Sequence, residues 1–277
     1  MKFANYSMFS REIKSHGLEY AVEHTAKIGF DGVEFLASYR AAPFFDNIQK
    51  VREAKKLLDS YGLSVCCYSM LAKLTVPDPA IGLDPVLYNV ECAAELGSPY
   101  FHHTVIPEYT HPTPDLTYSE ALEAVSERAS KIVEHCEKYG MTCLYEPQGI
   151  YMNGVEGLSG ILNEMKKNHT NVGICGDVGN SLWIDVSPED IYAAFNKDIK
   201  HIHVKDYVIK DAFSEGHTDF TTSGKAIYDV VPGEGCVDFE KLFSYVKGYT
   251  GNIGMEFVCD DDTMRKSIEY IKSCFNK

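Results

Sequence analysis

Eight short segments of the chain have the alternating or apolar pattern of β-strands, and the stretches between them have the apolar spacing of amphipathic helices. The strand-like segments are Phe3–Met8, Gly32–Leu36, Leu63–Ser69, Tyr100–Thr104, Met141–Glu146, Asn171–Asn180, Asp198–Asp206 and Asn252–Phe257. The helix-like segments are Leu18–Gly29, Ile48–Tyr61, Val86–Leu96, Ser119–Tyr139, Leu158–Lys167, a short one capped at Ser187, and Asp262–Cys274. Strands that alternate with helices over the whole length predict a parallel sheet. We expect an α/β fold, a single (β/α)8 TIM barrel that covers residues 1–277 as one domain.

The segment Asp198–Asp206 shows an unusual distribution of polar residues. If His203 faces the barrel interior, period-two alternation puts His201 and Lys205 on the same face and turns Ile202 and Val204 outward. Buried polar groups without partners cost several kcal/mol, roughly 2–7 by transfer scales. A strand with an aliphatic outer face and a polar inner face is therefore predicted to line a site.

Four consecutive strands at the end of the chain each finish with a side chain that can bind a metal. These side chains are Glu146, Asp177, His203 and Glu256. In a barrel the carboxyl ends of the strands meet at the rim where the chemistry takes place. Three carboxylates and one imidazole suit one divalent metal ion, Mn²⁺ or Mg²⁺ first, with Co²⁺ or Zn²⁺ also compatible. Around such an ion these ligands still leave one excess negative charge.

Each of these residues also has a plainer interpretation. An Asp such as Asp177 often caps a helix, and a single His203 is more often a core histidine with satisfied hydrogen bonds. The joint occurrence at four strand ends favours the metal. Weaker candidates for substrate binding, each with a structural role as the alternative, are Glu34, His102, His103, Asn180, Trp183 and Lys205. Alternation lets only one of His102 and His103 face the barrel.

Composition limits the partners of this protein. Of 277 residues 45% are hydrophobic and 24% charged, and the net charge is −14. An acidic surface disfavours nucleic acid and anionic membranes, which leaves a small neutral molecule as the expected partner. The nine cysteines have no zinc-finger spacing and are predicted to be reduced core thiols. The N-terminus lacks the apolar core of a secretory signal, so we expect a cytoplasmic protein.

One long connection follows the seventh predicted strand. It spans residues 207–236, has mixed polarity and several glycines, and shows no helical pattern. Irregular loops of this length are usually lids or binding loops. We expect this one to lie over the site.

Several motifs together resemble one known family. They are GFDGVEF with Glu34, LYEPQG with Glu146, DVGN from Asp177, HVKD from His203, PGEG at 232–235 and IGMEF with Glu256. The chain resembles the xylose-isomerase-like TIM barrel superfamily, and within it the sugar phosphate isomerase/epimerase family of ketose 3-epimerases, hydroxypyruvate isomerases and inosose dehydratases. The resemblance implies that Glu146, Asp177, His203 and Glu256 bind one divalent metal and that Glu146 and Glu256 act as acid and base.

The sequence departs from close relatives of the tagatose and psicose 3-epimerases at two places. Asn180 stands where a histidine is frequent, and residues 207–236 lack the expected arginine, for which Lys205 or Lys210 can substitute. Homo-oligomers are common among such barrels, and no residue fixes the number of subunits.

The chemistry follows from the ligands. A metal that chelates a carbonyl and a neighbouring hydroxyl stabilises the enediolate formed when a carboxylate removes the α-proton. We therefore expect a metal-dependent sugar isomerase or epimerase that acts on a small ketose or related polyol ketone. The alternative is a metal-dependent inosose-type dehydratase, a lyase. An apurinic endonuclease would need more histidines and a basic groove, and a non-catalytic sugar-binding barrel would need no metal.

Overall fold

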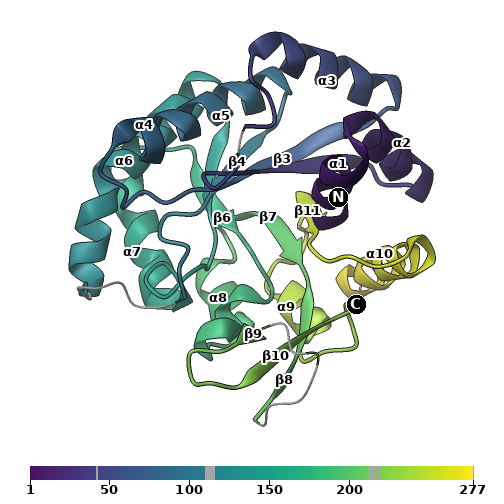
Figure 1. Cartoon of the computed structure of the whole chain (residues 1–277). Helices are drawn as coiled ribbons and strands as arrows, with labels where there is room; N and C mark the ends of the chain where they lie inside the picture. The colour runs from purple at the N-terminus through teal and green to yellow at the C-terminus, as the bar shows by residue number, and fades with distance from the viewer. Residues whose placement is uncertain (42, 110–115, 212–215, 217–218, 277) are drawn as a thin grey trace.

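The eight predicted strands form a closed parallel barrel, which confirms the predicted fold class (Figure 1). The structure is a computed structural model that describes residues 1–41, 43–109, 116–211, 216 and 219–276. Around the barrel the strands follow the order β1-β2-β3-β4-β5-β6-β7-β11, and β11 pairs with β1 to close it. Their bounds are β1 Lys2–Asn5, β2 Gly32–Ser38, β3 Ser64–Leu71, β4 Tyr100–His103, β5 Thr142–Tyr145, β6 Val172–Cys175, β7 Ile199–Val204 and β11 Asn252–Met255.

Helices surround the barrel, and local capping signals set their ends. Thr117 and Glu120 form a reciprocal capping box at the start of α6, and Ser187 caps α8 with Pro188 as its first residue. Gly29 ends α2 in the left-handed conformation, at φ +102°. The helices are α1 Ser7–His16, α2 Leu18–Ile28, α3 Ile48–Ser60, α4 Pro79–Gly82, α5 Asp84–Glu95, α6 Tyr118–Lys138, α7 Gly154–Lys166, the 3-10 turn η1 Asn180–Ile184, α8 Pro188–Phe195, α9 Phe239–Ser244 and α10 Asp261–Phe275.

The predicted first strand is wrong at its end. It was expected to reach Met8, but β1 ends at Asn5 and α1 begins at Ser7. The Asn5 side chain accepts a hydrogen bond from the Phe9 N–H at 2.9 Å and thereby supports the first turn of α1. Because only three residues of α1 are buried, its apolar pattern is too sparse to predict a helix.

The main hydrophobic core lies between the outer face of the barrel and the helices. On β7, Ile202 and Val204 point into this shell, as the alternation predicted. The interior of the barrel has a much smaller apolar cluster, formed by Cys67, Leu144 and Cys175. Above this floor the barrel interior is polar.

Residues 207–236 contain a small sheet, so the predicted irregular loop is wrong for the part that the structure describes. The antiparallel strands β8 Asp206–Lys210, β10 Ala226–Val230 and β9 Asp219–Phe220 pair in the order β8-β10-β9. We call this sheet the ribbon. It extends from the end of β7 beyond the barrel (Figure 1). Residues 212–215 and 217–218 of the predicted loop lie outside the described part.

Asp206 ties the two ends of the ribbon together. Its carboxylate accepts hydrogen bonds from the Tyr207 N–H at the start of the ribbon and from the N–H groups of Gly233, Gly235 and Val237 at its end, at 2.9–3.1 Å. A Cβ atom at Gly235 would lie 2.1 Å from an Asp206 carboxylate oxygen, so this close approach requires glycine. The ribbon is thus fixed to the barrel rim.

Among the described helices, none is long and apolar enough to cross a membrane. None of the nine cysteines forms a disulfide. The prediction of core thiols agrees with the seven that are buried, whereas Cys236 is exposed and Cys259 is half-buried; the buried ones are Cys66, Cys67, Cys92, Cys136, Cys143, Cys175 and Cys274.

Candidate active site at the carboxyl rim of the barrel

The four predicted strand-end residues converge at one rim of the barrel. His203 lies at their centre, and its Nδ1 atom is 3.2 Å from Glu146 Oε2, 3.3 Å from Glu256 Oε2 and 3.9 Å from Asp177 Oδ2. Glu146, Asp177 and His203 each offer a ligand atom, and these atoms lie within 4.8 Å of one another. Residues from four strands thus enclose one small volume.

Asp177 has one carboxylate oxygen committed to the backbone. Its Oδ1 atom accepts hydrogen bonds from the N–H groups of Gly179 and Asn180, at 2.8 and 2.6 Å. The sequence left capping and metal binding as alternative interpretations of Asp177. In the structure one oxygen caps the following turn and the other is left to face the site. Its second oxygen, Oδ2, is buried without an aligned hydrogen bond and points toward the site.

Lys205 places its ammonium group between the acidic side chains. Its Nζ atom is 2.9 Å from Asp177 Oδ2, 2.9 Å from Glu256 Oε2 and 2.9 Å from Asn180 Oδ1. Burial opposes the charged ammonium, but Asp177 and Glu256 outweigh it and hold the pKa of Lys205 well above its usual range. Lys205 is therefore a buried cation within the candidate site, together with Asn180.

Glu34 lies beneath the rim and holds two histidines. It accepts hydrogen bonds from His203 Nε2 at 2.9 Å and from His201 Nε2 at 2.8 Å, and its side chain is fully buried. Burial alone would raise the pKa of Glu34, but His203 and His201 hold it well below its usual range. Glu34 faces inward as predicted, but its contacts are with His203 and His201 rather than with the cavity, so the predicted substrate contact becomes a supporting role.

His102 and His103 separate as the alternation requires. His102 faces the interior, where its Nδ1 lies 2.9 Å from Ser69 Oγ and its Nε2 lies 3.2 Å from Glu146 Oε1. His103 points outward against Phe101 and Tyr145, and its Nδ1 lies 2.9 Å from the Thr104 carbonyl oxygen. The candidate role of His103 in substrate binding is therefore wrong, because its strand turns it into the shell.

A layer of hydrogen-bonded polar side chains lies beneath the rim, and we call Glu34, Ser69, His102 and His201 the polar layer. Ser69 donates a 2.5 Å hydrogen bond to Glu34, and its Oγ atom also lies 2.9 Å from His102 Nδ1. Glu34 contacts His203 and His102 contacts Glu146, so these polar contacts connect His203 with Glu146. Ligating histidines usually donate their second N–H to such a carboxylate, which fixes the tautomer and aims the other nitrogen at the site. With Nε2 held by Glu34, the Nδ1 atom of His203 points at the three carboxylates.

The two glutamates of the rim have opposite electrostatic surroundings. Burial raises the pKa of Glu256 to about 7 although Lys205 and His203 counteract it. At Glu146 burial also acts upward, but His102 and His203 outweigh it and lower the pKa below its usual range. Two carboxyl groups with pKa values driven apart can serve as a proton donor and a proton acceptor near neutral pH.

A cavity of about 440 Å³ opens beside this rim. Its lining comes from the ends of β7 and β11, from the ribbon, from α1 and from η1: Ser7, Trp183, Lys205, Asp206, Tyr207, Asp229, Val230, Val231, Glu256, Phe257 and Val258. Trp183, the only tryptophan, contacts Tyr109 and Tyr207 with ring centroids 4.9 and 6.2 Å apart. The ribbon thus forms one wall of the cavity. The cavity is large enough for a small sugar.

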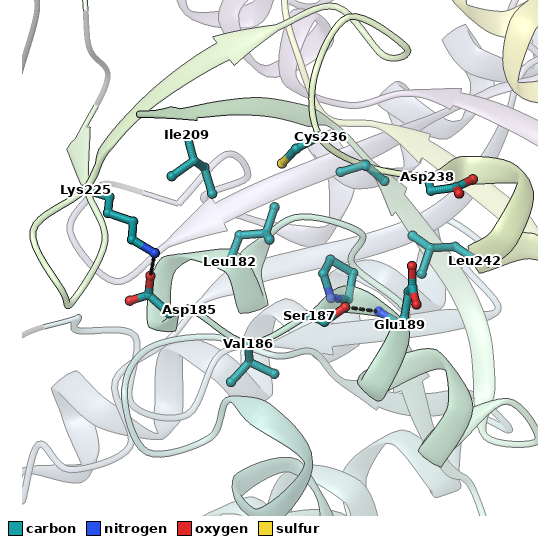
Figure 2. A pocket seen from close by; sticks show the side chains of 12 residues that line it. Leu182, Asp185, Val186, Ser187, Glu189, Ile209, Lys225, Cys236, Asp238 and Leu242 are labelled. Atoms are coloured by element: carbon teal, nitrogen blue, oxygen red, sulfur yellow. Dashed lines mark hydrogen bonds and ion pairs between the residues drawn. The ribbon is translucent and has the colours of Figure 1, made fainter. Parts of the chain in front are cut away.

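A second cavity, of about 350 Å³, lies outside the rim between α8, α9 and the ribbon (Figure 2). None of the four strand-end ligands lines it. Its charged groups pair locally: Lys225 Nζ lies 3.3 Å from Asp185, and Glu189 pairs with Lys241 at 2.5 Å. We assign this cavity no part in the chemistry.

Two residues of the site were not among the sequence candidates. Tyr6 stacks on the His203 ring at a centroid distance of 4.8 Å, and Ser69 joins Glu34 to His102. Alternation within the predicted strand Phe3–Met8 turns Ala4 and Tyr6 inward once Phe3 is placed in the shell, so a signal for Tyr6 was present although β1 ends at Asn5. For Ser69 it was not, since a serine in a strand has many other roles.

The donor set fits a divalent cation. Asp177 Oδ2 and Glu256 Oε2 lie 3.9 and 3.3 Å from His203 Nδ1, and each has the Lys205 ammonium group 2.9 Å away. These oxygens and the imidazole nitrogen thus face one small volume that already attracts a positive charge. Three carboxylates with one oriented imidazole form a ligand set typical of Mn²⁺, Mg²⁺ or Zn²⁺.

Comparison with known proteins identifies the family of this chain. Residues 22–274 match the xylose isomerase-like TIM barrel family. The chain belongs to this family. No curated protein sequence is significantly similar to it.

Solved structures give the same fold at low sequence identity. A D-psicose 3-epimerase from Clostridium cellulolyticum H10, solved with D-tagatose, has a TM-score of 0.77 at 16% identity and covers 99% of both chains. The IolI protein with a bound zinc atom has a TM-score of 0.70 at 17% identity over 99% of this chain and 96% of its own. The probable 3-DHS dehydratase AsbF from Bacillus anthracis has a TM-score of 0.72 at 16% identity over 98% and 99%. Such identities show the fold alone, and these neighbours differ in their reactions.

Proposed function

We propose that this protein is a metal-dependent sugar isomerase or epimerase that acts on a small ketose or a related polyol ketone. The observation that carries the proposal is the convergence of Glu146, Asp177 and Glu256 on His203 Nδ1, beside a cavity that Glu256 lines. These four residues would hold one divalent ion, with Mn²⁺ or Mg²⁺ favoured by the excess of oxygen ligands. When bound, the ion would polarise a substrate carbonyl and offset the negative charge that develops on its oxygen.

The side chains of the rim supply the proton transfers. Glu256 reaches the cavity, where its carboxyl group can exchange a proton with the substrate, and burial raises its pKa to about 7 in the protein without a bound ion. Glu146 lies deeper and stays ionised, so it accepts rather than donates in the resting protein. If both glutamates reach the substrate from opposite sides the product is an epimer, and if only Glu256 does, the proton moves between adjacent carbons.

The cavity favours an uncharged substrate. Its ionisable lining is mainly acidic, from Asp206, Asp229 and Glu256, with Lys205 as its one basic residue. Such a lining disfavours a phosphate group, and the ring of Trp183 offers an apolar face to the carbon skeleton of a sugar. The D-tagatose complex of the structurally similar 3-epimerase supports a free ketose as the first compound class to test.

A dehydratase is the second candidate. Of the two rim glutamates only Glu256 lines the described cavity, and elimination of water after α-proton removal needs a single carboxylate in contact with the substrate. The probable 3-DHS dehydratase AsbF has a similar fold, which supports testing this second candidate. An inosose-type ketone is the corresponding substrate class.

Proton exchange in D₂O tests the proposal. The purified protein is incubated with Mn²⁺ and a panel of ketoses and keto-cyclitols, and NMR follows the α-proton and the products. Deuterium at the α-carbon together with a new sugar isomer supports the proposal. Loss of water establishes the dehydratase, and absence of exchange with every compound rejects both. Glu256→Gln and chelator-treated protein are the controls, and metal analysis is expected to give about one ion per chain.

A further inference from the structure

Lys205 occupies an unexpected place for a cationic side chain. Its ammonium group lies among the side chains that would hold the divalent ion, 2.9 Å from two of their oxygens. We propose that Lys205 is an internal counter-ion that competes with the divalent cation for Asp177 and Glu256, and that metal loading displaces it toward Asn180 and the substrate cavity. This inference rests on the proposed metal-dependent function and specifies how the same site is regulated.

The competition arises because the available oxygens are few. Asp177 Oδ1 is already engaged by the N–H groups of Gly179 and Asn180. Only Oδ2 remains for a ligand, and Oδ2 is the atom that Lys205 approaches. On Glu256 the oxygen close to Lys205, Oε2, is also the one close to His203 Nδ1. In this geometry a cation held by His203 and these carboxylates uses Asp177 Oδ2 and Glu256 Oε2, the two oxygens that Lys205 approaches.

Charge balance explains the presence of the lysine. Three carboxyl groups that share one small volume repel one another through their negative charges when no cation is bound. Lys205 compensates part of this charge in the metal-free protein. After the divalent ion binds, one negative charge is left over, and a displaced but nearby ammonium still compensates it. Lys205 thus stabilises the metal-free protein from its place between Asp177 and Glu256, and the metal-bound protein from its displaced place near Asn180.

The surroundings of Lys205 fix the aliphatic part of its side chain but leave the terminal ammonium group room to move. A Cβ atom at Gly179 would lie 2.9 Å from Lys205 Cγ, so the missing side chain of Gly179 provides the slot for the stem. At the far end Nζ has a third, neutral partner in Asn180 Oδ1 at 2.9 Å. Lys205 also lines the cavity of about 440 Å³. A small rotation of the last bonds can keep the contact with Asn180 and present the ammonium to a substrate.

Mn²⁺ binding measured by isothermal titration calorimetry tests the proposal in wild-type protein, Lys205→Met and Lys225→Met. Lys225 is the matched control because it loses the same charge but pairs with Asp185 outside the rim. We expect Lys205→Met to bind Mn²⁺ at least about tenfold more tightly than wild type, and Lys225→Met to bind within about twofold of it. We also expect metal-free Lys205→Met to have a lower melting temperature than metal-free wild type, and Mn²⁺ to raise the melting temperature of the variant by more than that of wild type.

A second measurement on unmodified protein separates displacement from a general charge effect. Acetylation of Lys205, read by mass spectrometry, should be slow without Mn²⁺ and faster with it, while labelling of Lys225 stays constant. Equal labelling in both states, or Mn²⁺ affinity of Lys205→Met equal to or weaker than wild type, would overturn the competition. If neither wild type nor Lys205→Met binds Mn²⁺, Mg²⁺ or Zn²⁺, the metal-dependent function itself fails, and this inference fails with it. The labelling result does not depend on the expression of any variant.

Discussion

The shell and the interior of this barrel are built from the same strands but have opposite compositions. Between barrel and helices the packing is aliphatic and aromatic, with residues such as Phe101, Ile132 and Ile202 fully buried. Inside the barrel the described residues form a small apolar cluster of Cys67, Leu144 and Cys175 with Tyr100 against it, and above it Glu34, His201 and His203 are joined by polar contacts. Barrel interiors are more commonly filled by branched aliphatic side chains.

The contrast separates stability from function along each strand. On β7, Ile202 and Val204 contribute hydrophobic burial, and the alternating His201, His203 and Lys205 contribute charged and hydrogen-bonding groups to the rim. Buried ion pairs add little net stability because desolvation opposes them. A protein that places such groups in its interior therefore depends on its shell for folding, and we expect variants of the two regions to fail in different ways.

The largest expected effect is on activity, from Glu256→Gln. The amide keeps the size of the side chain but removes the group that exchanges a proton, so we expect proton exchange into a responsive ketose to fall about 10²–10⁴-fold. The free energy of unfolding should change little, because Lys205 keeps Asp177 as a partner. Exchange rate and urea unfolding measure the two quantities. Wild-type exchange in this variant would exclude Glu256 from the chemistry.

The next effect is on stability, from Ile132→Ala in α6. This fully buried side chain belongs to the shell, and its truncation should lower the free energy of unfolding by about 2–5 kcal/mol. Mn²⁺ affinity per folded molecule should stay unchanged. The control Glu123→Ala, at an exposed position of the same helix, should shift stability by less than about 0.5 kcal/mol. A large change in Mn²⁺ affinity in Ile132→Ala would show that the shell and the rim are coupled.

A smaller effect is expected in the polar layer, from Glu34→Gln. Loss of this carboxylate releases the Nε2 atom of His203, and supporting carboxylates of this kind typically contribute about 10–100-fold to metal affinity. Titration with Mn²⁺ measures the change. Glu95→Gln, which removes a carboxylate paired with Arg52 near the surface, is the control and should have no effect. Unchanged affinity in Glu34→Gln would make the layer purely structural.

The smallest expected effect is on the pH dependence of stability, and it comes from His24 in the helices outside the barrel. His24 lies 2.5 Å from Glu12 and 3.0 Å from Asp261. Partial burial lowers the pKa of His24, but these two carboxylates outweigh it and raise that pKa. The ion pairs of protonated His24 therefore contribute fully to stability below the unfolded-state pKa of about 6.5. This contribution is lost as the pH rises through the higher folded-state pKa of His24.

We expect His24→Gln to destabilise the protein by roughly 0.5–1 kcal/mol near pH 5.5 and by almost nothing near pH 9. Urea unfolding of wild type and variant at both values measures the difference, with the exposed His16→Gln as control. A difference that grows toward high pH would reverse the sign and contradict the ion-pair explanation.

Much of this arrangement was predictable from alternation alone. Period two correctly placed His203, Lys205 and Glu34 inward, and it left only one of His102 and His103 in the barrel. Alternation gives the face of a strand but not the height of a residue inside the barrel. The height depends on strand tilt and register, which is why Glu34 and His102 were expected at the substrate and lie below the rim instead.

The remaining errors have local causes. The Asn5 side chain starts a helix directly after β1, and nothing in the apolar spacing of residues 7–16 announces it. The ribbon was hidden because its strands pair with each other rather than with the barrel, so they do not follow the strand-helix alternation. Tyr207 and Ile209 have strand propensity, but the glycines and polar residues between β8 and β10 suggested a loop.

Asp206 gives the ribbon the character of an exchangeable module. Because the Asp206 carboxylate binds the chain both where it leaves the barrel and where it returns, we expect changes in the length or sequence of residues 208–232 to leave the ends that adjoin the rim in place. Relatives, or engineers, that graft a different segment between these anchors would reshape the entrance and leave the reactive groups where they are.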